Sequence, residues 1–157
     1  MTSSLVGSEM CIRDRVYDAI GRTPAQIRPD GLILCYPVIT GGEYAHVNSF
    51  KRLLGDDVTQ EQRDAVSLEN FVTEQTPRAF IWHTYTDENV PVENSLLLAA
   101  AMKRKNVNFE LHIYPTGGHG LSLADEETAG NGFQVVEQCQ SWIPLVKMWL
   151  KHFEASC

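Results

Sequence analysis

The feature of this sequence that most restricts its fold is a strand–helix–strand pattern. AFIWHTYT (79–86) is rich in aromatic and β-branched residues, which favour strands. NFELHIYP (108–115) alternates Phe109, Leu111 and Ile113 with Glu110, His112 and Tyr114, which also predicts a strand. Between them, VENSLLLAAAMKRK (92–105) consists of strong helix formers and ends in cations, which suit the last turn of a helix. A helix that joins two strands in this way makes a right-handed crossover, so both strands point in the same direction. The pattern therefore predicts a parallel sheet covered by helices.

Two further segments complete the predicted architecture. GLILCYPV (31–38) is apolar on both faces, as expected for a strand that is buried on both sides of a parallel sheet. Near the C-terminus, apolar residues recur at helical spacing and predict a closing helix. They are Trp142, Leu145, Val146, Trp149, Leu150 and Phe153. We predict an α/β fold with about three parallel strands, a crossover helix and a C-terminal helix.

Residues 39–77 interrupt this regular pattern. They are polar and irregular, and a long excursion of this kind in a compact domain is usually a lid or a binding loop. Short helices are indicated within it. Ser49 is a candidate N-cap for a helix that Gly55 ends, and Thr59 with Gln62 has the spacing of a capping box. We expect this segment to be a lid-like insertion.

Each strand of the crossover unit is followed by a residue with acid–base chemistry. Asp87 follows the first strand, and His119 lies on a glycine-rich loop after the second. Parallel strands end at the same edge, about 4.8 Å apart if adjacent, so the carboxylate can reach the imidazole. Such a carboxylate fixes the tautomer of the ring and stabilises the imidazolium. The plainer interpretations are that Asp87 caps a turn and that His119 is a surface residue.

These residues carry a family resemblance. HTYTDENVPVENS (83–95) and YPTGGHGLSLA (114–124) resemble the last two triad segments of the α/β-hydrolase superfamily, in the branch of small esterases and acetyl-xylan-esterase-like proteins. The triad order in that superfamily is nucleophile, acid, histidine. The resemblance, which extends over nearly all of the chain after its N-terminal segment, implies that Asp87 is the acid and His119 the base. His83 opens the His-x-x-x-Asp pattern of the first segment.

The resemblance implies a serine hydrolase of small acyl esters, such as acetylated sugars. Two other hypotheses stay open. One is a prolyl-oligopeptidase-like serine peptidase, whose triad segments are similar, and the other is a non-catalytic binding module of the same fold. Glu88 is a rival for the acid role, and the direction of its side chain after the strand decides between it and Asp87.

The nucleophile of such a triad does not appear in the sequence. Neither Gly-x-Ser-x-Gly nor His-Gly-Gly occurs in residues 16–157. Ser122 lies close to His119 on the same loop but lacks the surrounding elbow, and Cys35 lies within a predicted buried strand, where a thiol is inert. We therefore expect a C-terminal fragment of a single α/β-hydrolase domain, inactive by itself, whose missing N-terminal half carries the serine.

The first fifteen residues are interpreted as a fusion scar, a non-native segment derived from an adaptor, and are excluded from the fold. LVGSEMCIRDR (5–15) is similar to the translation of a transposase adaptor that is used in sequencing libraries. We therefore assign residues 1–15 to this scar and residues 16–157 to the hydrolase fragment.

Composition and charge restrict the partners. The formal net charge of −7 lacks the basic character of nucleic-acid binding proteins, and no apolar run is long enough to span a membrane. The four cysteines show no C-x-x-C spacing, which favours free thiols in a reducing cytoplasm. No cluster has the spacing of metal ligands. The prediction is a cytoplasmic enzyme without cofactor or metal, whose partners are a small-molecule ester substrate and the missing N-terminal half.

Overall fold

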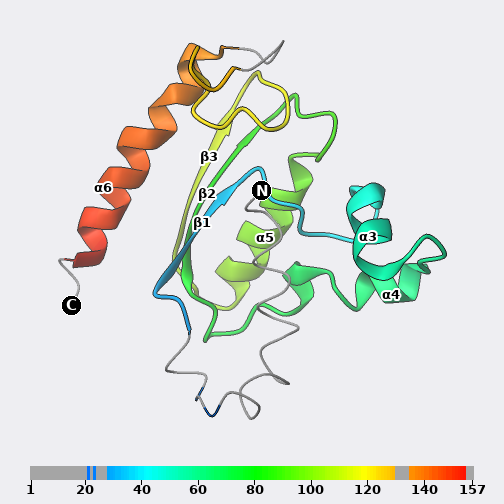
Figure 1. The fold of residues 1–157 in the computed structure, drawn as a ribbon. Coiled ribbons are helices and arrows are strands. Elements are labelled where there is room, and N and C mark those ends of the chain that lie inside the picture. The colour runs from blue at the N-terminus through cyan, green and yellow to red at the C-terminus, as the bar shows by residue number, and fades with distance from the viewer. Residues whose placement is uncertain (1–20, 22, 24–27, 130–134, 155–157) are drawn as a thin grey trace.

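The computed structural model describes residues 21, 23, 28–129 and 135–154. The proposed scar, residues 1–15, lies outside the described residues. In chain order the elements are β1 (Gly31–Cys35), α3 (Val47–Leu54), α4 (Gln60–Asp64), the 3₁₀ helix η1 (Leu68–Asn70), β2 (Arg78–Thr84), α5 (Glu93–Arg104), β3 (Phe109–Tyr114), the 3₁₀ helix η2 (Glu137–Ser141) and α6 (Trp142–Glu154) (Figure 1). None of the described helices has the length and apolar character needed to cross a bilayer.

The three strands form one parallel sheet in the order β1-β2-β3. In its register Leu34 lies opposite Ile81, which in turn lies opposite Leu111. Helix α5 makes the crossover between β2 and β3, as the strand–helix–strand pattern predicts. The predicted fold class, a parallel sheet covered by helices, is confirmed.

Successive residues of β2 point into two separate cores. Ala79 and Ile81 pack in the cluster on the face that α5 covers, whereas Phe80 and Trp82 pack in the cluster on the opposite face, under α6 (Figure 1). None of the four side chains is exposed to solvent. Because residues of a strand alternate between its faces, burial on both sides requires a continuous apolar run. This is the physical reason that residues 79–82 of β2 form a continuous apolar run.

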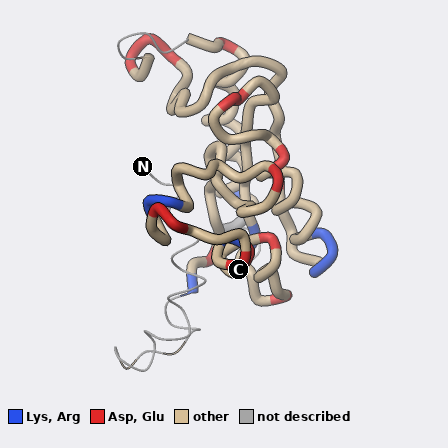
Figure 2. The backbone as a smooth tube through the Cα atoms, turned by 90° about the vertical axis from the view of Figure 1, so that its right-hand side faces the viewer, with Lys and Arg blue, Asp and Glu red and all other residues tan. Residues whose placement is uncertain are grey.

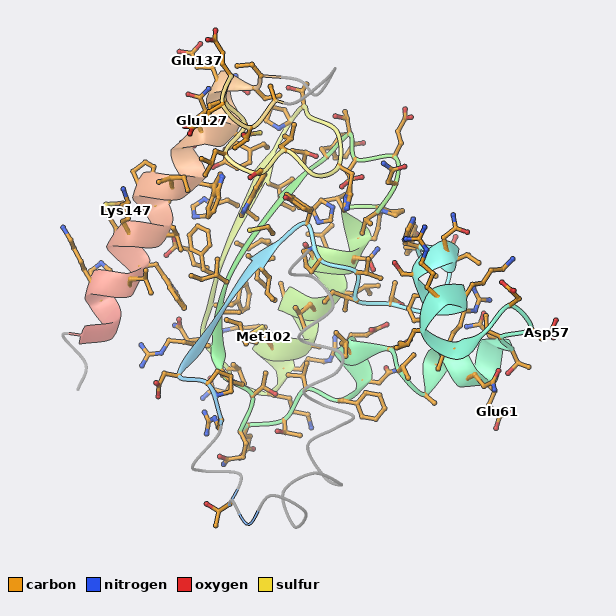
Figure 3. The ribbon with its side chains drawn as sticks, viewed as in Figure 1. Asp57, Glu61, Met102, Glu127, Glu137 and Lys147 are labelled. Carbon is orange, nitrogen blue, oxygen red and sulfur yellow. The ribbon has the colours of Figure 1, made fainter. Side chains whose placement is uncertain are left out.

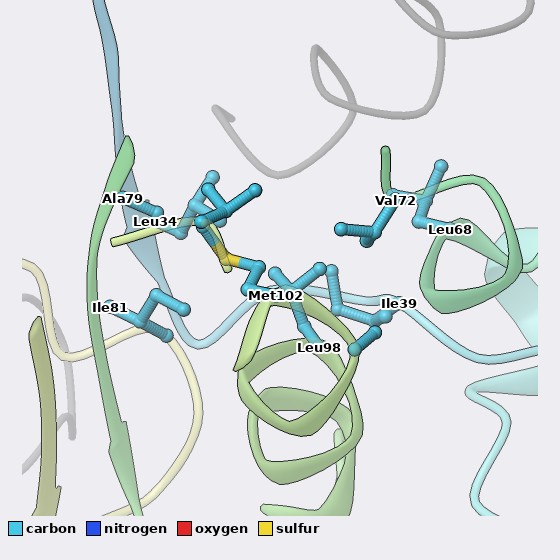
Figure 4. Close-up of a cluster of buried hydrophobic side chains, with 10 residues drawn as sticks. Leu34, Ile39, Leu68, Val72, Ala79, Ile81, Leu98 and Met102 are labelled. Carbon is cyan, nitrogen blue, oxygen red and sulfur yellow. The ribbon is translucent and has the colours of Figure 1, made fainter. Parts of the chain in front are cut away.

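The core on the α5 side also holds part of the excursion 39–77. Met102 of α5 lies between Leu34 of the sheet and the side chains of Ile39 and Val72 (Figure 4). All four are buried. The excursion is therefore fixed to the main fold by its own apolar residues at both ends of the segment.

The outer part of the excursion consists of α3 and α4, on the side of the molecule remote from α6 (Figure 1). The predicted capping box is confirmed, because Thr59 Oγ1 accepts from Gln62 N and Gln62 Oε1 accepts from Thr59 N. Gly55 ends α3 as expected. Ser49 as N-cap is wrong: α3 begins at Val47, and the Ser49 hydroxyl instead bonds to His46 Nδ1 at 2.8 Å.

A buried asparagine connects the start of the excursion to α5. Asn94 Oδ1 accepts hydrogen bonds from Ile39 N and Thr40 N, both at 2.9 Å. Its Nδ2 donates to Tyr44 O at 2.9 Å and to Pro91 O at 3.0 Å. The side-chain amide is fully buried and uses both of its donors and its acceptor. Asn94 therefore fixes the path of the chain as it leaves β1.

Strand β1 is shorter than the sequence predicts. We expected a strand over 31–38, but β1 ends at Cys35. The next residue, Tyr36, has a φ of +41°, in the left-handed region, and this conformation cannot continue a strand. The chain turns away from the sheet at this point.

Apart from the buried Asp87, the charged side chains of the described residues are at least partly exposed. Lys and Arg form short, separated stretches, which include the last turns of α3 and α5 (Figure 2). Asp57 and Glu61 point outward from the α3–α4 side, whereas Glu127 and Glu137 lie near the start of α6 (Figure 3). Apolar and aromatic residues form the two cores that lie against the faces of the sheet.

Candidate active site

The candidate acid and base lie on neighbouring loops at the carboxyl edge of the sheet. Asp87 is in the turn that follows β2, and His119 is in the loop that follows β3. Both loops leave the same edge because the two strands are parallel and adjacent (Figure 1). His119 Nδ1 lies 2.7 Å from Asp87 Oδ2. The structure therefore brings the two predicted site residues into direct contact.

The carboxylate of Asp87 is buried, and both of its oxygens are hydrogen-bonded. Its Oδ1 accepts hydrogen bonds from Asn89 N at 3.0 Å and Val90 N at 2.9 Å, which leaves Oδ2 for the histidine. Burial of this carboxyl group raises its pKa, but hydrogen bonds from His119, His83 and the backbone of Val90 outweigh the burial. The pKa of Asp87 is held well below its usual value, so the group is ionised at neutral pH.

A second histidine contacts the same carboxylate. His83 is fully buried, with Nδ1 2.8 Å from Ser95 Oγ and Nε2 2.9 Å from Val90 O and 3.3 Å from Asp87 Oδ2. Since a carbonyl oxygen only accepts, Nε2 carries the proton and Nδ1 accepts from the Ser95 hydroxyl. His83 thus supports the turn that presents Asp87. In the sequence His83 is visible only as the first residue of the His-x-x-x-Asp pattern, and this fixed spacing from Asp87 is the available signal for its supporting role.

A glycine brings the histidine loop close to β2. Gly117 has a φ of +144°, and a Cβ on it would lie 2.7 Å from Leu121 Cδ1 and 2.8 Å from Thr84 Cγ2. Its carbonyl oxygen accepts a hydrogen bond from Thr84 Oγ1 at 2.9 Å. Only glycine fits this approach, two residues before His119 in the chain.

The other candidates from the sequence do not join the dyad. Glu88 is exposed, whereas Asp87 points inward. Among the described residues, no hydrogen bond connects Ser122 Oγ with His119. Cys35 is half-buried, and burial raises the pKa of its thiol, which disfavours the reactive thiolate.

Two other histidines of the described chain bond to near neighbours: His112 Nε2 lies 2.8 Å from Glu110 Oε1, and His46 bonds to Ser49. In the part of the chain that the structure describes, no group of three or more His, Cys, Asp or Glu side chains is placed to hold a metal ion. The chemistry that the observed arrangement does provide is acid–base chemistry at the His119 ring, backed by an ionised carboxylate.

A sequence profile of the prolyl oligopeptidase family matches residues 44–143, well over half of the chain. The chain belongs to this family. The matched segment contains both Asp87 and His119. Solved structures of similar hydrolases also confirm the α/β-hydrolase fold that the sequence motifs predict.

This prolyl oligopeptidase family chain is similar to proteins that are named for xylan and ester hydrolysis. It is 49% identical over 100 residues to endo-1,4-beta-xylanase B of Butyrivibrio fibrisolvens and 33% identical over 106 residues to the acetylxylan esterase of Xylanibacter ruminicola. Each match covers 64% of this chain, but only 16% and 22% of the two relatives.

A crystal structure of an acetyl ester-xyloside bifunctional hydrolase from Caldicellulosiruptor lactoaceticus matches this prolyl oligopeptidase family chain with a TM-score of 0.61 at 44% sequence identity. The match covers 76% of this chain and 43% of that one. This chain therefore spans less than half the length of each of these three proteins.

Proposed function

We propose that this chain carries the acid and the base of a serine esterase, with Asp87 and His119 in those roles. The observation that supports the proposal most directly is the 2.7 Å contact between His119 Nδ1 and the buried, ionised carboxylate of Asp87. This contact leaves Nε2 as the ring nitrogen that exchanges a proton with the reacting groups.

In the proposed reaction a serine hydroxyl attacks the carbonyl carbon of the ester. His119 Nε2 takes the proton from the serine as the new C–O bond forms, and Asp87 stabilises the resulting imidazolium. The imidazolium then gives this proton to the leaving alcohol, which departs as the acyl-enzyme forms. A water molecule releases the acyl group by the same sequence of proton transfers, and the serine is regenerated.

We propose that the serine comes from a segment outside these 157 residues. The absence of a Gly-x-Ser-x-Gly motif from the sequence supports this, as does the greater length of the relatives. The partner of the chain would then be the N-terminal part of the same hydrolase domain.

For the substrate we propose small acyl esters, in particular acetyl groups on plant-wall sugars. The support is the similarity to an acetylxylan esterase and to an acetyl ester-xyloside bifunctional hydrolase. The His119–Asp87 geometry itself suits acyl transfer in general and does not select the acyl group.

A chimera tests the proposed roles. Residues 28–154 would replace the equivalent part of the Caldicellulosiruptor hydrolase, and turnover of p-nitrophenyl acetate would be measured. We expect activity in the chimera and a loss of at least about a thousandfold in kcat/KM on His119→Ala or Asp87→Asn. The matched control is His112→Ala, which removes a histidine of β3 and should leave kcat/KM within about threefold.

The unfused chain should show no turnover above its own His119→Ala variant. His119-dependent turnover by the unfused chain would contradict an external nucleophile, and full activity of the His119→Ala chimera would contradict the base role.

The match to the prolyl oligopeptidase family supports a second candidate function, a serine peptidase that uses the same dyad. An enzyme that contains this chain together with the upstream reading frame would separate the two. Faster turnover of acetylated xylo-oligosaccharides than of dipeptide anilides supports the esterase, and the reverse order supports the peptidase.

A further inference from the structure

Tyr36 occupies an unusual position at the edge of the sheet that carries the dyad. It directly follows β1 and has a φ of +41°. Residues other than glycine rarely adopt a positive φ, and for a bulky residue it is a true outlier. Its backbone N–H still donates to Trp82 O at 2.8 Å, so the chain remains attached to β2 at this point. Strained residues of this kind cluster at functional sites, where the neighbouring structure holds them in place.

The strained backbone places the Tyr36 ring against the candidate base. The ring centroids of Tyr36 and His119 are 4.9 Å apart, with an interplanar angle of 68°. The Tyr36 ring also makes an edge contact with buried Trp82, at 5.1 Å and 83°. Trp82 is fully buried and therefore gives the tyrosine ring a fixed support.

The phenol of Tyr36 holds the loop that carries His119. Its oxygen accepts a hydrogen bond from Ser122 N at 3.3 Å, and the carbonyl oxygen of Ser122 accepts one from Trp142 Nε1 at 2.9 Å. Trp142 in turn stacks on Trp82, at 5.4 Å and 18°. Both the N–H and the C=O of Ser122, which has a φ of +54°, are thus bonded to aromatic side chains.

We propose that Tyr36 is a positioning residue for His119: its ring packs against the imidazole, and its phenol anchors the following loop at Ser122. The proposal rests on the proposed function in so far as His119 is the base. A histidine between glycines has a mobile backbone, and a contact on its ring removes rotamers in which Nδ1 leaves Asp87. Burial raises the pKa of Tyr36, although its bond to Ser122 opposes this, so the phenol stays neutral beside the carboxylate.

The test uses the whole 157-residue chain and needs no enzymatic activity. In ¹⁵N-histidine NMR spectra at neutral pH, the unsubstituted protein should show His119 as the Nδ1–H tautomer, with a proton signal protected by Asp87. In Tyr36→Leu this signal should be lost to exchange with water, and the ¹⁵N shifts should move toward the Nε2–H form that free imidazole favours.

The matched control is Tyr114→Leu. Tyr114 is the last residue of β3, so it also lies at the carboxyl end of the sheet. Its ring makes an edge contact with Trp82 at 5.9 Å and its hydroxyl bonds to Ser141, but it has no ring contact with His119. Its variant should keep the Nδ1–H signal. Equal retention in both leucine variants, or equal loss in both, would overturn the proposal.

A milder variant tests the phenol alone. Tyr36→Phe keeps the ring and should keep the His119 signal, but amide exchange at Ser122 should accelerate by roughly two- to tenfold. The amide of Thr128, which donates to Asp125 Oδ1, should be unchanged. Unaltered exchange at Ser122 would overturn the anchoring role. Absence of the Nδ1–H signal from the unsubstituted protein would instead overturn the Asp87–His119 contact itself, and with it both proposals.

Discussion

Thr86 and Gly117 are joined by two hydrogen bonds: Gly117 N donates to Thr86 Oγ1 at 2.9 Å, and Thr86 Oγ1 donates to Gly117 O at 3.0 Å. Together with the bond from Thr84 to the same carbonyl, they hold the histidine loop against the end of β2. The spacing of Asp87 and His119 is therefore supported by hydrogen bonds between the residues that precede them, and not only by the contact between the two side chains.

Replacing Gly117 should disrupt this arrangement. A Cβ at residue 117 would lie far inside contact distance of Leu121 and Thr84, and the backbone there has a positive φ. We expect Gly117→Ala to lower the free energy of unfolding by about 2–4 kcal/mol in urea titrations. Gly118→Ala is the matched control, because no atom lies within 4 Å of the added carbon, and it should change stability by less than about 0.5 kcal/mol. Equal effects of the two variants would contradict this account.

Asp87 should make stability depend on acid pH. Its pKa in the folded protein lies below the value of about 3.9 for an unfolded aspartate. Its ionisation therefore stabilises the fold above about pH 4, and this contribution is lost as the pH falls further. Asp87→Asn should lower the free energy of unfolding by roughly 1–3 kcal/mol at neutral pH. The difference in this free energy between the variant and the unsubstituted protein should shrink as the pH falls.

Urea unfolding over a pH series measures this difference. The control is Asp57→Asn, an exposed carboxylate that points away from the fold (Figure 3). If the difference in the free energy of unfolding between Asp87→Asn and the unsubstituted protein stays constant down to about pH 2, ionisation of Asp87 does not contribute to stability as proposed.

Asn94→Ala should be one of the most destabilising single substitutions in the described chain. It leaves the buried N–H groups of Ile39 and Thr40 without their acceptor, and each such group costs about 1–3 kcal/mol. We expect a loss of about 3 kcal/mol or more in the free energy of unfolding. Asn70→Ala, at an exposed asparagine of η1, is the control. A loss near 0.5 kcal/mol for Asn94→Ala would mean that water replaces the lost bonds.

Cys139 should resist alkylation in the native protein. Burial raises the pKa of its thiol to about 11, so little thiolate is present at about pH 8. Labelling of Cys139 with iodoacetamide, followed by peptide mapping, should be at least about a hundredfold slower in the native chain than in the guanidinium-denatured chain. A thiol pKa that is raised by roughly two units lowers the fraction of thiolate by about this factor. Comparable labelling rates in the native and denatured states would show that the core under α6 opens readily to solvent.

The elements that follow from apolar patterning could be predicted from the sequence. The alternation of β2 residues between two cores requires a continuous apolar run at residues 79–82, and this run is visible without coordinates. The approach of Asp87 to His119 could also be predicted, because it requires only that two parallel strands be adjacent.

Features that depend on long-range contacts could not be predicted in this way. The positive φ of Tyr36 ends β1 early, and its ring contact with His119 joins residues that are far apart in the chain. No local pattern marks such a position. Ser49 shows a different failure: its hydroxyl was expected to cap a helix, but α3 already begins at Val47, so Ser49 lies inside the helix and its hydroxyl bonds to His46 Nδ1.

Tyr36, Asp87 and His119 each follow a different strand of one sheet: Tyr36 comes directly after β1, Asp87 three residues after the end of β2, and His119 five residues after the end of β3. The distance between neighbouring strands, which the backbone hydrogen bonds keep nearly constant, therefore fixes where the loops that carry them begin. Lengthening the connections that run on from these residues would reshape the surroundings of the proposed dyad without moving the strand ends that carry it. Under the proposed function, selectivity can thus change while the acid and the base stay in place.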